Sequence, residues 1–275
     1  MPIDEHVIIS FDIDRIIFHS YRISYIVYFA VYYIGKMNAS EIIKKTEPDA
    51  PEYKKLDNHV KFSFMITYIL LLTTATITFV EAMRTKNPNV RHILNLETCI
   101  SLVAGYFYSV FVDKIAKSEE KMANMDWSET SQIRYVDWAI TTPFMLLALC
   151  LVLSTNIKKP ICLYTMVGVV LLDYAMLYAG YLGEMKTIST FMAEFTGFGA
   201  FFAMFYLIYS KYVKPGANTA NRVLFGIYFL IWSMYGVAYV FNEEYKNIAM
   251  NVLDLFAKCF MGIGLWIYYT RILSV

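Results

Sequence analysis

The chain is a succession of long apolar runs separated by short polar connections. From residue 60 onward there are seven runs of about 20 residues or more, each long enough to cross the hydrocarbon core of a bilayer as a helix. Backbone groups in lipid must be hydrogen-bonded within their own segment, so helices are the expected form. The predicted spans are 60–83, 92–115, 132–153, 161–182, 187–210, 222–241 and 247–273. The pattern predicts an all-α integral membrane protein.

The charges in the connections predict its orientation. RTKNPNVRH, STNIKKP and SKYVKPGANTANR carry lysine and arginine without acids, whereas the alternate connections KSEEKMANMDWSET and NEEYKN are mixed or acidic. Basic connections stay preferentially in the cytoplasm. We therefore expect the first group, and with it the C-terminus, on the cytoplasmic side.

The first 59 residues form an extension before the predicted seven-helix domain, residues 60–275. Within it, IIFHSYRISYIVYFAVYYIG (residues 16–35) is apolar but is interrupted by His19 and Arg22. This extra helix is either an eighth spanning segment or a tyrosine-rich helix that lies at the outer membrane surface. The sequence leaves both readings open. The charged, proline-containing stretch that follows is expected to be a linker or an outer cap.

Composition narrows the partners. The chain is 58% hydrophobic and has a formal net charge of only +1, which favours membrane lipid and gives no reason to expect nucleic acid. The four cysteines occur singly, without CxxC or CxxH spacing. The sequence therefore predicts neither a disulfide framework nor a metal site.

One lysine stands out, because Lys258 lies in the middle of the last apolar run. About ten residues on either side put its Cα roughly 15 Å from each end, too far for the ammonium to reach an interface. Asp254 precedes it by four residues, on the same helix face. Two readings remain: a structural ion pair, or an amine that forms an imine with an aldehyde.

The third run supplies a second acid. Arg134, Asp137 and Thr141 recur at spacings of three and four, so they share one face of the helix. Ionisable groups paired within a membrane indicate a functional site. Aromatic side chains surround it in the sequence: Trp138 follows Asp137, and WSMYGVAY places Trp232, Tyr235 and Tyr239 on one face. Beside a buried ion cluster, they are expected to form the walls for a flat apolar ligand.

These segments together resemble the microbial (type I) rhodopsins over about residues 60–273. The matching elements are RYVDWAITTP, LLDYAMLYAGYLG, WSMYGVAY and LDLFAK, in this order on four of the predicted helices. The resemblance implies a seven-helix photoreceptor, not an enzyme. It implies all-trans retinal on Lys258 as a protonated Schiff base, with Asp137 and Asp254 as counterions and Asp137 as proton acceptor. Arg134 would lie just outside them.

The resemblance also implies a retinal pocket, and it raises a question about ion transport. The implied pocket residues are Trp138, Thr141, Thr142, Met145, Asp173, Met176, Gly180, Trp232, Tyr235 and Tyr239, together with Lys258. In the proton pumps of this family, a carboxyl group eleven residues after the counterion returns the proton. Here that position is Ala148. This departure argues against efficient pumping.

Other polar groups indicate a path for cations. Glu81 ends the first predicted span, Glu97 and Ser101 lie in the second, and Asn251 lies in the last. FVEAMRT and LNLETCISLVAGYFY resemble the giant-virus rhodopsins, in particular their channel-forming group. That likeness implies a light-gated cation channel that conducts protons, Na⁺ or K⁺. The alternatives are an outward proton pump or a sensory rhodopsin, and a homo-oligomer stays open.

Overall fold

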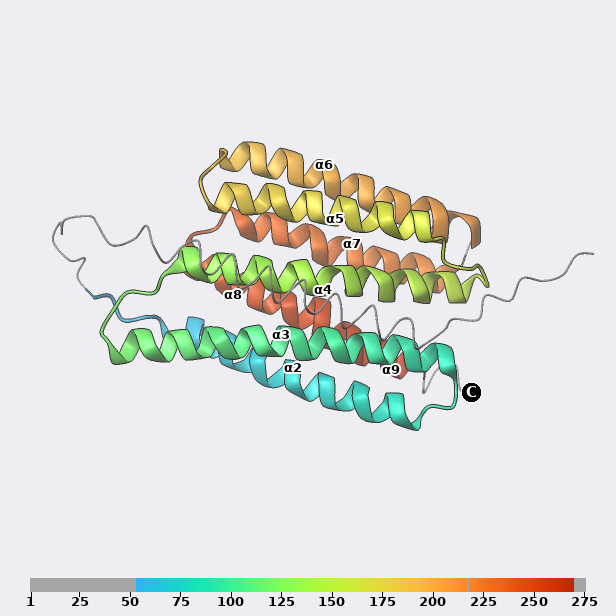
Figure 1. Cartoon of the computed structure of the whole chain (residues 1–275), viewed down its shortest axis with the longest axis horizontal. Helices are drawn as coiled ribbons and strands as arrows, with labels where there is room; N and C mark the ends of the chain where they lie inside the picture. The colour runs from blue at the N-terminus through green and yellow to red at the C-terminus, as the bar shows by residue number, and fades with distance from the viewer. Residues whose placement is uncertain (1–52, 217, 270–275) are drawn as a thin grey trace, which may run out of the picture. The chain divides into compact units, whose positions relative to one another are not determined.

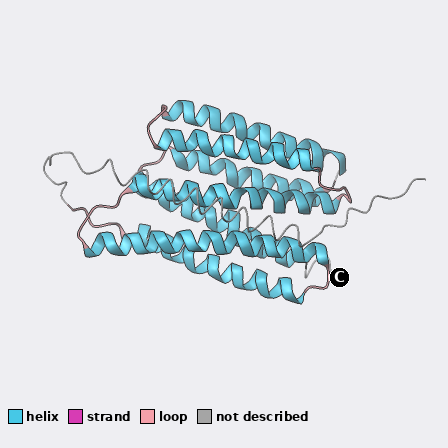
Figure 2. Ribbon diagram, in the orientation of Figure 1, coloured by secondary structure: helices cyan, strands magenta, loops and turns pink. Residues whose placement is uncertain are grey.

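In the computed structural model, which describes residues 53–216 and 218–269, seven membrane-length helices form one bundle (Figures 1 and 2). The prediction of an all-α, seven-span protein is confirmed. The predicted helix at residues 16–35 lies outside the described residues. The elements are α2 (Asn58–Arg84), α3 (Pro88–Glu120), α4 (Trp127–Asn156), α5 (Leu163–Glu184), α6 (Thr190–Ile208) with η1 (Tyr209–Val213) and η2 (Lys214–Gly216), α7 (Thr219–Tyr239), and α8 (Glu243–Asp254) with η3 (Leu255–Phe260) and α9 (Met261–Ile267).

Several helices are longer than their apolar runs. α3 has 33 residues and α4 has 30, whereas the sequence predicted spans of 92–115 and 132–153. At 1.5 Å per residue, 33 residues extend about 50 Å, which exceeds the roughly 30 Å hydrocarbon core. The apolar run marks the part of a helix that lies in lipid, and the polar turns continue the helix into water.

Side-chain caps determine where most of the helices begin. At each of these positions a carboxylate, amide or hydroxyl oxygen accepts a hydrogen bond from a backbone N–H in the first turn, which would otherwise have no intrahelical partner. The capping residues are Asp57, Asn87, Asp126, Ser189, Asn218 and Asn242. Each of them belongs to a polar connection, so the same residues end one span and position the next.

The distribution of polar residues is that of a protein with a lipid-facing surface. Large apolar side chains such as Phe62, Phe195 and Leu230 are exposed, whereas a set of charged, amide and hydroxyl side chains is buried inside the bundle. The buried polar set includes Thr67, Thr74, Thr78, Glu97, Ser101, Arg134, Asp137, Asp173, Asn221, Asn251, Asp254 and Lys258. The interior, not the outer surface, therefore carries the candidate chemistry.

The last span is interrupted by a π-helical segment. α8 packs against α2 and α7, and the chain then widens into η3 before α9 completes the span. Lys258 lies within η3 and is buried there. Single π-helical turns inside a helix occur frequently at functional sites.

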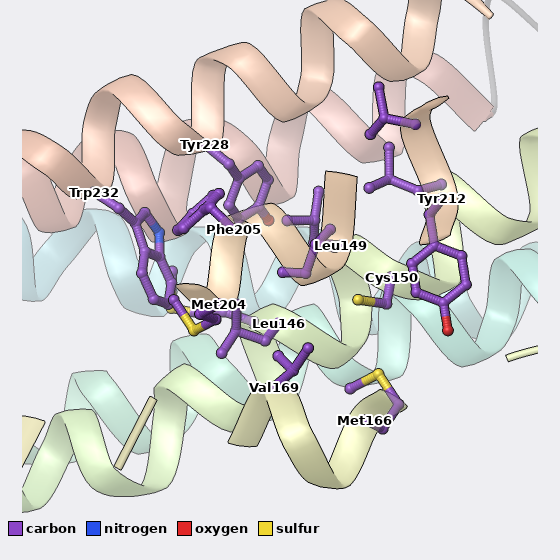
Figure 3. Close-up of a cluster of buried hydrophobic side chains, with 14 of the residues drawn as sticks. Leu146, Leu149, Cys150, Met166, Val169, Met204, Phe205, Tyr212, Tyr228 and Trp232 are labelled. Carbon is purple, nitrogen blue, oxygen red and sulfur yellow. The ribbon is translucent and has the colours of Figure 1, made fainter. Parts of the chain in front are cut away.

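The bundle has two chemically different halves. α2 and α4 end, and α3 begins, at the right-hand end in Figure 1. We call the half toward that end the glutamate half, because it contains Glu97, and the opposite half the arginine half, because it contains Arg134. Between α4, α5, α6 and α7 the glutamate half is filled by apolar side chains, among them Leu146, Leu149 and Phe205 (Figure 3).

Candidate functional site

Lys258 forms two ion pairs inside the bundle. Its Nζ lies 2.9 Å from Asp137 Oδ2 on α4 and 3.4 Å from Asp254 Oδ2 on α8. The lysine side chain is 1% exposed and both carboxylates are 0% exposed. A buried charge of this kind persists only where opposite charges and hydrogen bonds replace its hydration. The ammonium therefore links two helices through the interior.

The local sequence explains how these groups meet. Asp254 is the last residue of α8 and lies four residues before Lys258, so both side chains point to the same side of the span. On α4, the Thr141 hydroxyl donates to the Asp137 carbonyl at 2.9 Å and lies 3.4 Å from Asp137 Oδ1. Thr141 thus packs against the acid, and in this structure it is not part of the cavity wall.

Arg134 anchors a hydrogen-bond network on the other side of Asp254. Its Nη2 donates to Asn247 Oδ1 at 3.0 Å and to Asn251 Oδ1 at 2.9 Å. Its Nη1 lies 3.7 Å from Asp254 Oδ2 and 3.3 Å from the Tyr108 hydroxyl, which donates to the same carboxylate oxygen at 2.8 Å. The guanidinium also lies over the rings of Phe64, Tyr108 and Phe111. Asn251, predicted for an ion pathway, lies in this network.

The cluster is electrically balanced among the described residues. Lys258 and Arg134 carry two positive charges, and Asp137 and Asp254 carry two negative charges. The two carboxylates differ in their hydrogen bonds. Asp254 accepts from both Tyr108 and Tyr235, at 2.8 and 2.6 Å, whereas within the described part of the chain the Asp137 carboxylate accepts only the long contact from Thr141 besides its lysine partner. Asp254 is therefore the more strongly hydrogen-bonded of the two carboxylates.

A cavity adjoins Lys258. Together with the open space at its mouth, its empty volume is about 820 Å³. Its lining is mostly aromatic and aliphatic, which suits an apolar ligand. The lining residues are Tyr135, Trp138, Thr142, Met145, Met176, Leu177, Gly180, Ala193, Glu194, Gly197, Phe198, Phe201, Trp232, Tyr235, Gly236, Tyr239, Met250, Asp254 and Lys258.

The structure gathers most of the predicted pocket residues around this cavity. Trp138 meets Tyr235 edge to face, with ring centroids 5.4 Å apart, and Trp232 meets Phe205 in the same way at 6.0 Å. Asp173 is not in the cavity wall. It accepts a 2.6 Å hydrogen bond from the hydroxyl of Thr142, and Thr142 does line the cavity. That bond ties α5 to α4 beside the cavity.

The remaining predicted residues lie in the glutamate half. Glu81 is near the end of α2, where it pairs with Arg84 at 2.9 Å. Glu97 and Ser101 are buried on α3, and within the described residues Glu97 Oε1 and Ser101 Oγ have no hydrogen-bond partner. Ala148 is also buried, so the helix that carries Asp137 presents a methyl group at this position.

Sequence reasoning missed Tyr108 and Asn247, which contact Arg134 directly. A signal for Asn247 was present: Asn247, Asn251, Asp254 and Lys258 follow one another at spacings of four, three and four. Such a stripe marks one helix face. Tyr108 gave no comparable signal, because tyrosine is frequent in this chain at lipid-facing positions as well.

Comparison with known proteins places this site in a family. The sequence pattern that defines the bacteriorhodopsin-like proteins matches residues 58–272, well over half of the chain. The chain belongs to this family of microbial rhodopsins. The crystal structure of the viral rhodopsin OLPVRII is 43% identical, with a TM-score of 0.71, over 78% of this chain and 98% of that one.

More distant rhodopsins share the fold. Acetabularia Rhodopsin I is 16% identical, with a TM-score of 0.65, over 81% of this chain and 99% of that chain. The green-light absorbing proteorhodopsin of a gamma-proteobacterium is 26% identical over 161 residues, 51% of this chain and 63% of the relative. The chain thus matches less than two thirds of the length of that curated rhodopsin.

Membership of the rhodopsin family implies retinal, and the residues around the cavity fit it. Lys258 presents a primary amine at the cavity wall, and Trp138, Trp232 and Tyr235 supply flat aromatic surfaces there. A Cβ atom at Gly236 would overlap the ring of Phe198, so glycine is required for this packing of the wall. An elongated, apolar aldehyde is the class of ligand that this arrangement can hold.

Proposed function

We propose that this rhodopsin holds all-trans retinal as a covalent imine at Lys258 Nζ and acts as a light-gated cation channel. Bound retinal supplies the absorption of visible light and an isomerisation that displaces its surroundings. The observation that carries the proposal is the buried Lys258 amine, which lines the cavity and is paired with two carboxylates. Stability alone does not explain a buried lysine with two carboxylates, because well-packed apolar side chains of similar volume often give a fold of equal or greater stability.

The ion cluster determines where a proton from Nζ goes. Asp137 Oδ2 is 2.9 Å away along an existing hydrogen bond, and its carboxylate has the weaker set of additional donors. Transfer of the proton leaves Asp137 and the nitrogen both neutral, while Arg134 and Asp254 still balance each other. The cluster therefore has no net charge before or after the transfer, which keeps the electrostatic cost low. Asp137 is the proposed acceptor, and Asp254 stays ionised.

The proposed orientation puts the glutamate half toward the cytoplasm, in line with its basic connections. In that half α4 carries no acid after Asp137, and Ala148 is buried where a proton donor would stand in a pump. The carboxyl groups there, Glu81 and Glu97, come from α2 and α3 instead. Acidic and hydroxyl groups on these two helices suit a cation path.

An outward proton pump is the second candidate. It is favoured by the continuous polar network from Asp254 through Arg134 to Asn247, which reaches toward the end of the arginine half. A network of this kind can carry a proton away from the ion cluster. This candidate lacks a proton donor on α4 in the glutamate half, where Ala148 occupies the donor position.

Photocurrent against voltage tests the two candidates. In voltage-clamped cells that express the full chain with retinal, we expect a light-induced current that reverses sign near the cation equilibrium potential and follows that potential when external Na⁺ is replaced. The control is Lys258→Ala, which should give no photocurrent. A current that keeps one direction at all voltages would reject the channel in favour of the pump. A coloured protein without any current would reject both and indicate a sensor.

A further inference from the structure

A second polar cluster lies in the glutamate half, separate from the Lys258 cavity. It consists of Thr74 on α2 and Glu97 and Ser101 on α3, which are at most 2% exposed. Among the residues that the structure describes, Thr74 Oγ1, Glu97 Oε1 and Ser101 Oγ have no hydrogen-bond partner. Buried polar atoms are almost always paired, so three such oxygens in one region indicate a ligand.

The backbone of the last span brings the cluster together. A Cβ atom at Gly262 would lie 3.1 Å from Glu97 Oε2 and 3.2 Å from Thr74 Cγ2, so both side chains crowd around this glycine. Ser101 follows Glu97 by four residues and lies on the same face of α3. Gly262 in turn follows Lys258 by four residues. The cluster is therefore in contact with the helix that carries the photoactive lysine.

Neighbouring groups satisfy these oxygens at most weakly: beside the Thr74 hydroxyl lies the thiol of Cys259, which is a poor hydrogen-bonding group. The next hydroxyls, Thr78 and Thr98, bond to each other at 2.9 Å and to backbone carbonyls of their own helices. Within the described part of the chain, no lysine, arginine or histidine forms an ion pair with Glu97, whereas Glu81 on the neighbouring helix has Arg84. A buried carboxyl without a positive partner must be neutralised by a proton or by a mobile cation.

We propose that Thr74, Glu97 and Ser101 form a binding site for a small monovalent cation such as Na⁺, which replaces the proton on Glu97. Hard cations prefer carboxylate and hydroxyl oxygens. With one carboxylate, a monovalent ion gives a neutral site, whereas a divalent ion would leave an uncompensated buried charge. The exchange is balanced: Glu97 releases one proton to water for each cation bound. This inference rests on the proposed cation conductance, and it assigns a binding site to the conducted ion.

Binding can be measured in the dark on the purified full chain. At fixed pH and ionic strength, Na⁺ replaces N-methylglucamine while infrared spectroscopy follows the carbonyl stretch of protonated carboxyl groups and a pH indicator follows released protons. We expect one carboxyl band to disappear saturably, with about one proton released per chain. In Glu97→Gln the Na⁺-dependent band and the proton release should both be absent. A spectrum that does not respond to Na⁺, or the same response in Glu97→Gln, would overturn the proposal and leave an ordered water as occupant.

A matched pair of threonine variants tests the ligand set. Thr74→Val removes a hydroxyl whose described neighbour is only the weakly bonding Cys259 thiol, so thermal stability should be kept while the Na⁺ concentration at half-saturation rises about tenfold. Thr78→Val, one turn along α2, removes a satisfied hydroxyl and should lower stability without moving the half-saturation point. Equal Na⁺ affinities in Thr74→Val and the parent would overturn the proposed site. Because these measurements need no light, an absent photocurrent and an absent cation site are separate outcomes.

Discussion

The two halves of the bundle differ in how fully their buried polar groups are paired near the bundle centre. In the arginine half, Arg134, Tyr108, Asn247 and Asn251 bond to one another, and Tyr108 bonds to Asp254, over distances of 2.8 to 3.3 Å. Asn251 also donates to the Ser63 hydroxyl at 2.9 Å, which draws in α2. Side chains from α2, α3, α4 and α8 thus take part in this network.

Interhelical ion pairs strengthen the same half. Lys246 on α8 is largely buried and binds Glu184 on α5 at 3.0 Å and Glu243 at 2.9 Å. Lys61 pairs with Glu119 between α2 and α3, at 2.6 Å. Partly buried pairs between different helices resist relative motion more than exposed pairs do.

The glutamate half is less fully bonded. Asn221 near its end bonds to Asn156 and to two backbone carbonyls, but apolar side chains such as Leu146 and Leu149 fill much of its centre (Figure 3), and within the described residues its buried acid Glu97 has an unpaired oxygen. Apolar contacts can be rearranged at lower cost than a saturated hydrogen-bond network. The comparison indicates that motion driven from Lys258 is taken up by the glutamate half, while the arginine half stays fixed.

The largest expected effect is the loss of colour in Lys258→Ala, since no other group on the cavity wall is a primary amine. Absorbance after reconstitution with retinal should have no visible band. Lys246→Arg is the matched control, because Lys246 is a second buried lysine of the same span, on α8, but belongs to the ion pairs of the arginine half. That variant should keep the band. A visible band in Lys258→Ala would show that retinal is not attached to Lys258.

The second effect compares the stability of the two halves directly. Arg134→Gln leaves Asp254 without its cationic neighbour on that side, and breaking a buried pair of this kind costs about 3–5 kcal/mol. Ser101→Ala in the glutamate half removes a hydroxyl with no partner among the described residues, so it loses no hydrogen bond and should not lower stability. Thermal unfolding of both variants in one detergent measures the difference. Equal losses would contradict the contrast between the halves.

The sequence was sufficient for the spans and for half of the site. Apolar length gave the seven helices, and the spacing between Asp254 and Lys258 gave their shared face, because both signals are local. The partnership of Arg134 with Asn247 and Asn251 depends on how α4 and α8 face each other, which no local spacing specifies. The π-helical turn at Leu255–Phe260 adds to this, since it rotates every later side chain relative to an ideal helix.

The same limit applies to the glutamate half. The sequence marked Glu97 and Ser101 as polar groups inside an apolar run, but it grouped them with Asn251, which lies with Arg134 in the structure. Thr74 and Gly262 carried no signal, because single threonines and glycines are common in membrane helices. The contact of Gly262 with Glu97 became visible only when α3 and α9 were placed together.

The third effect separates the two carboxylates of the ion cluster. Asp137→Asn removes the closer negative charge from Lys258 Nζ, so a cationic chromophore there loses ground-state stabilisation and its visible band should shift to the red. When the pH is raised, the variant should also lose its visible band at a lower pH than the parent does. Asp254→Asn should shift the band less, because its oxygen lies 3.4 Å from Nζ and is shared with Tyr108. A larger shift in Asp254→Asn would make that residue the main counterion.

The fourth effect concerns current alone. Glu97→Gln should alter cation selectivity, measured as a shift of the reversal potential when Na⁺ replaces K⁺, because it removes the one acid of the second cluster. Glu97 does not line the cavity next to Lys258, so the absorption maximum should move little. The matched variant is Glu129→Gln. Glu129 pairs with Lys114 at the arginine-half end, far from the second cluster along the bundle, so this variant should leave the reversal potential unchanged. Identical reversal potentials in Glu97→Gln and the parent would make Glu97 a structural residue.

The smallest effect tests whether exposed ion pairs add to the rigidity of the arginine half. The Lys54 ammonium donates a 2.8 Å hydrogen bond to Glu244 at the start of α8, and this bond, with the charge of Glu244, raises the pKa of Lys54 above its ordinary value of 10.5. A lysine whose pKa is raised on folding stabilises the fold below the unfolded pKa, and that contribution is lost as the pH rises through the folded value. In Glu244→Gln, NMR titration should return the Lys54 pKa toward 10.5, while the melting temperature near pH 7 stays the same, because exposed pairs contribute little. A clear fall in melting temperature would assign part of the rigidity to the surface, and the contrast between the halves would then rest less on the Arg134 network.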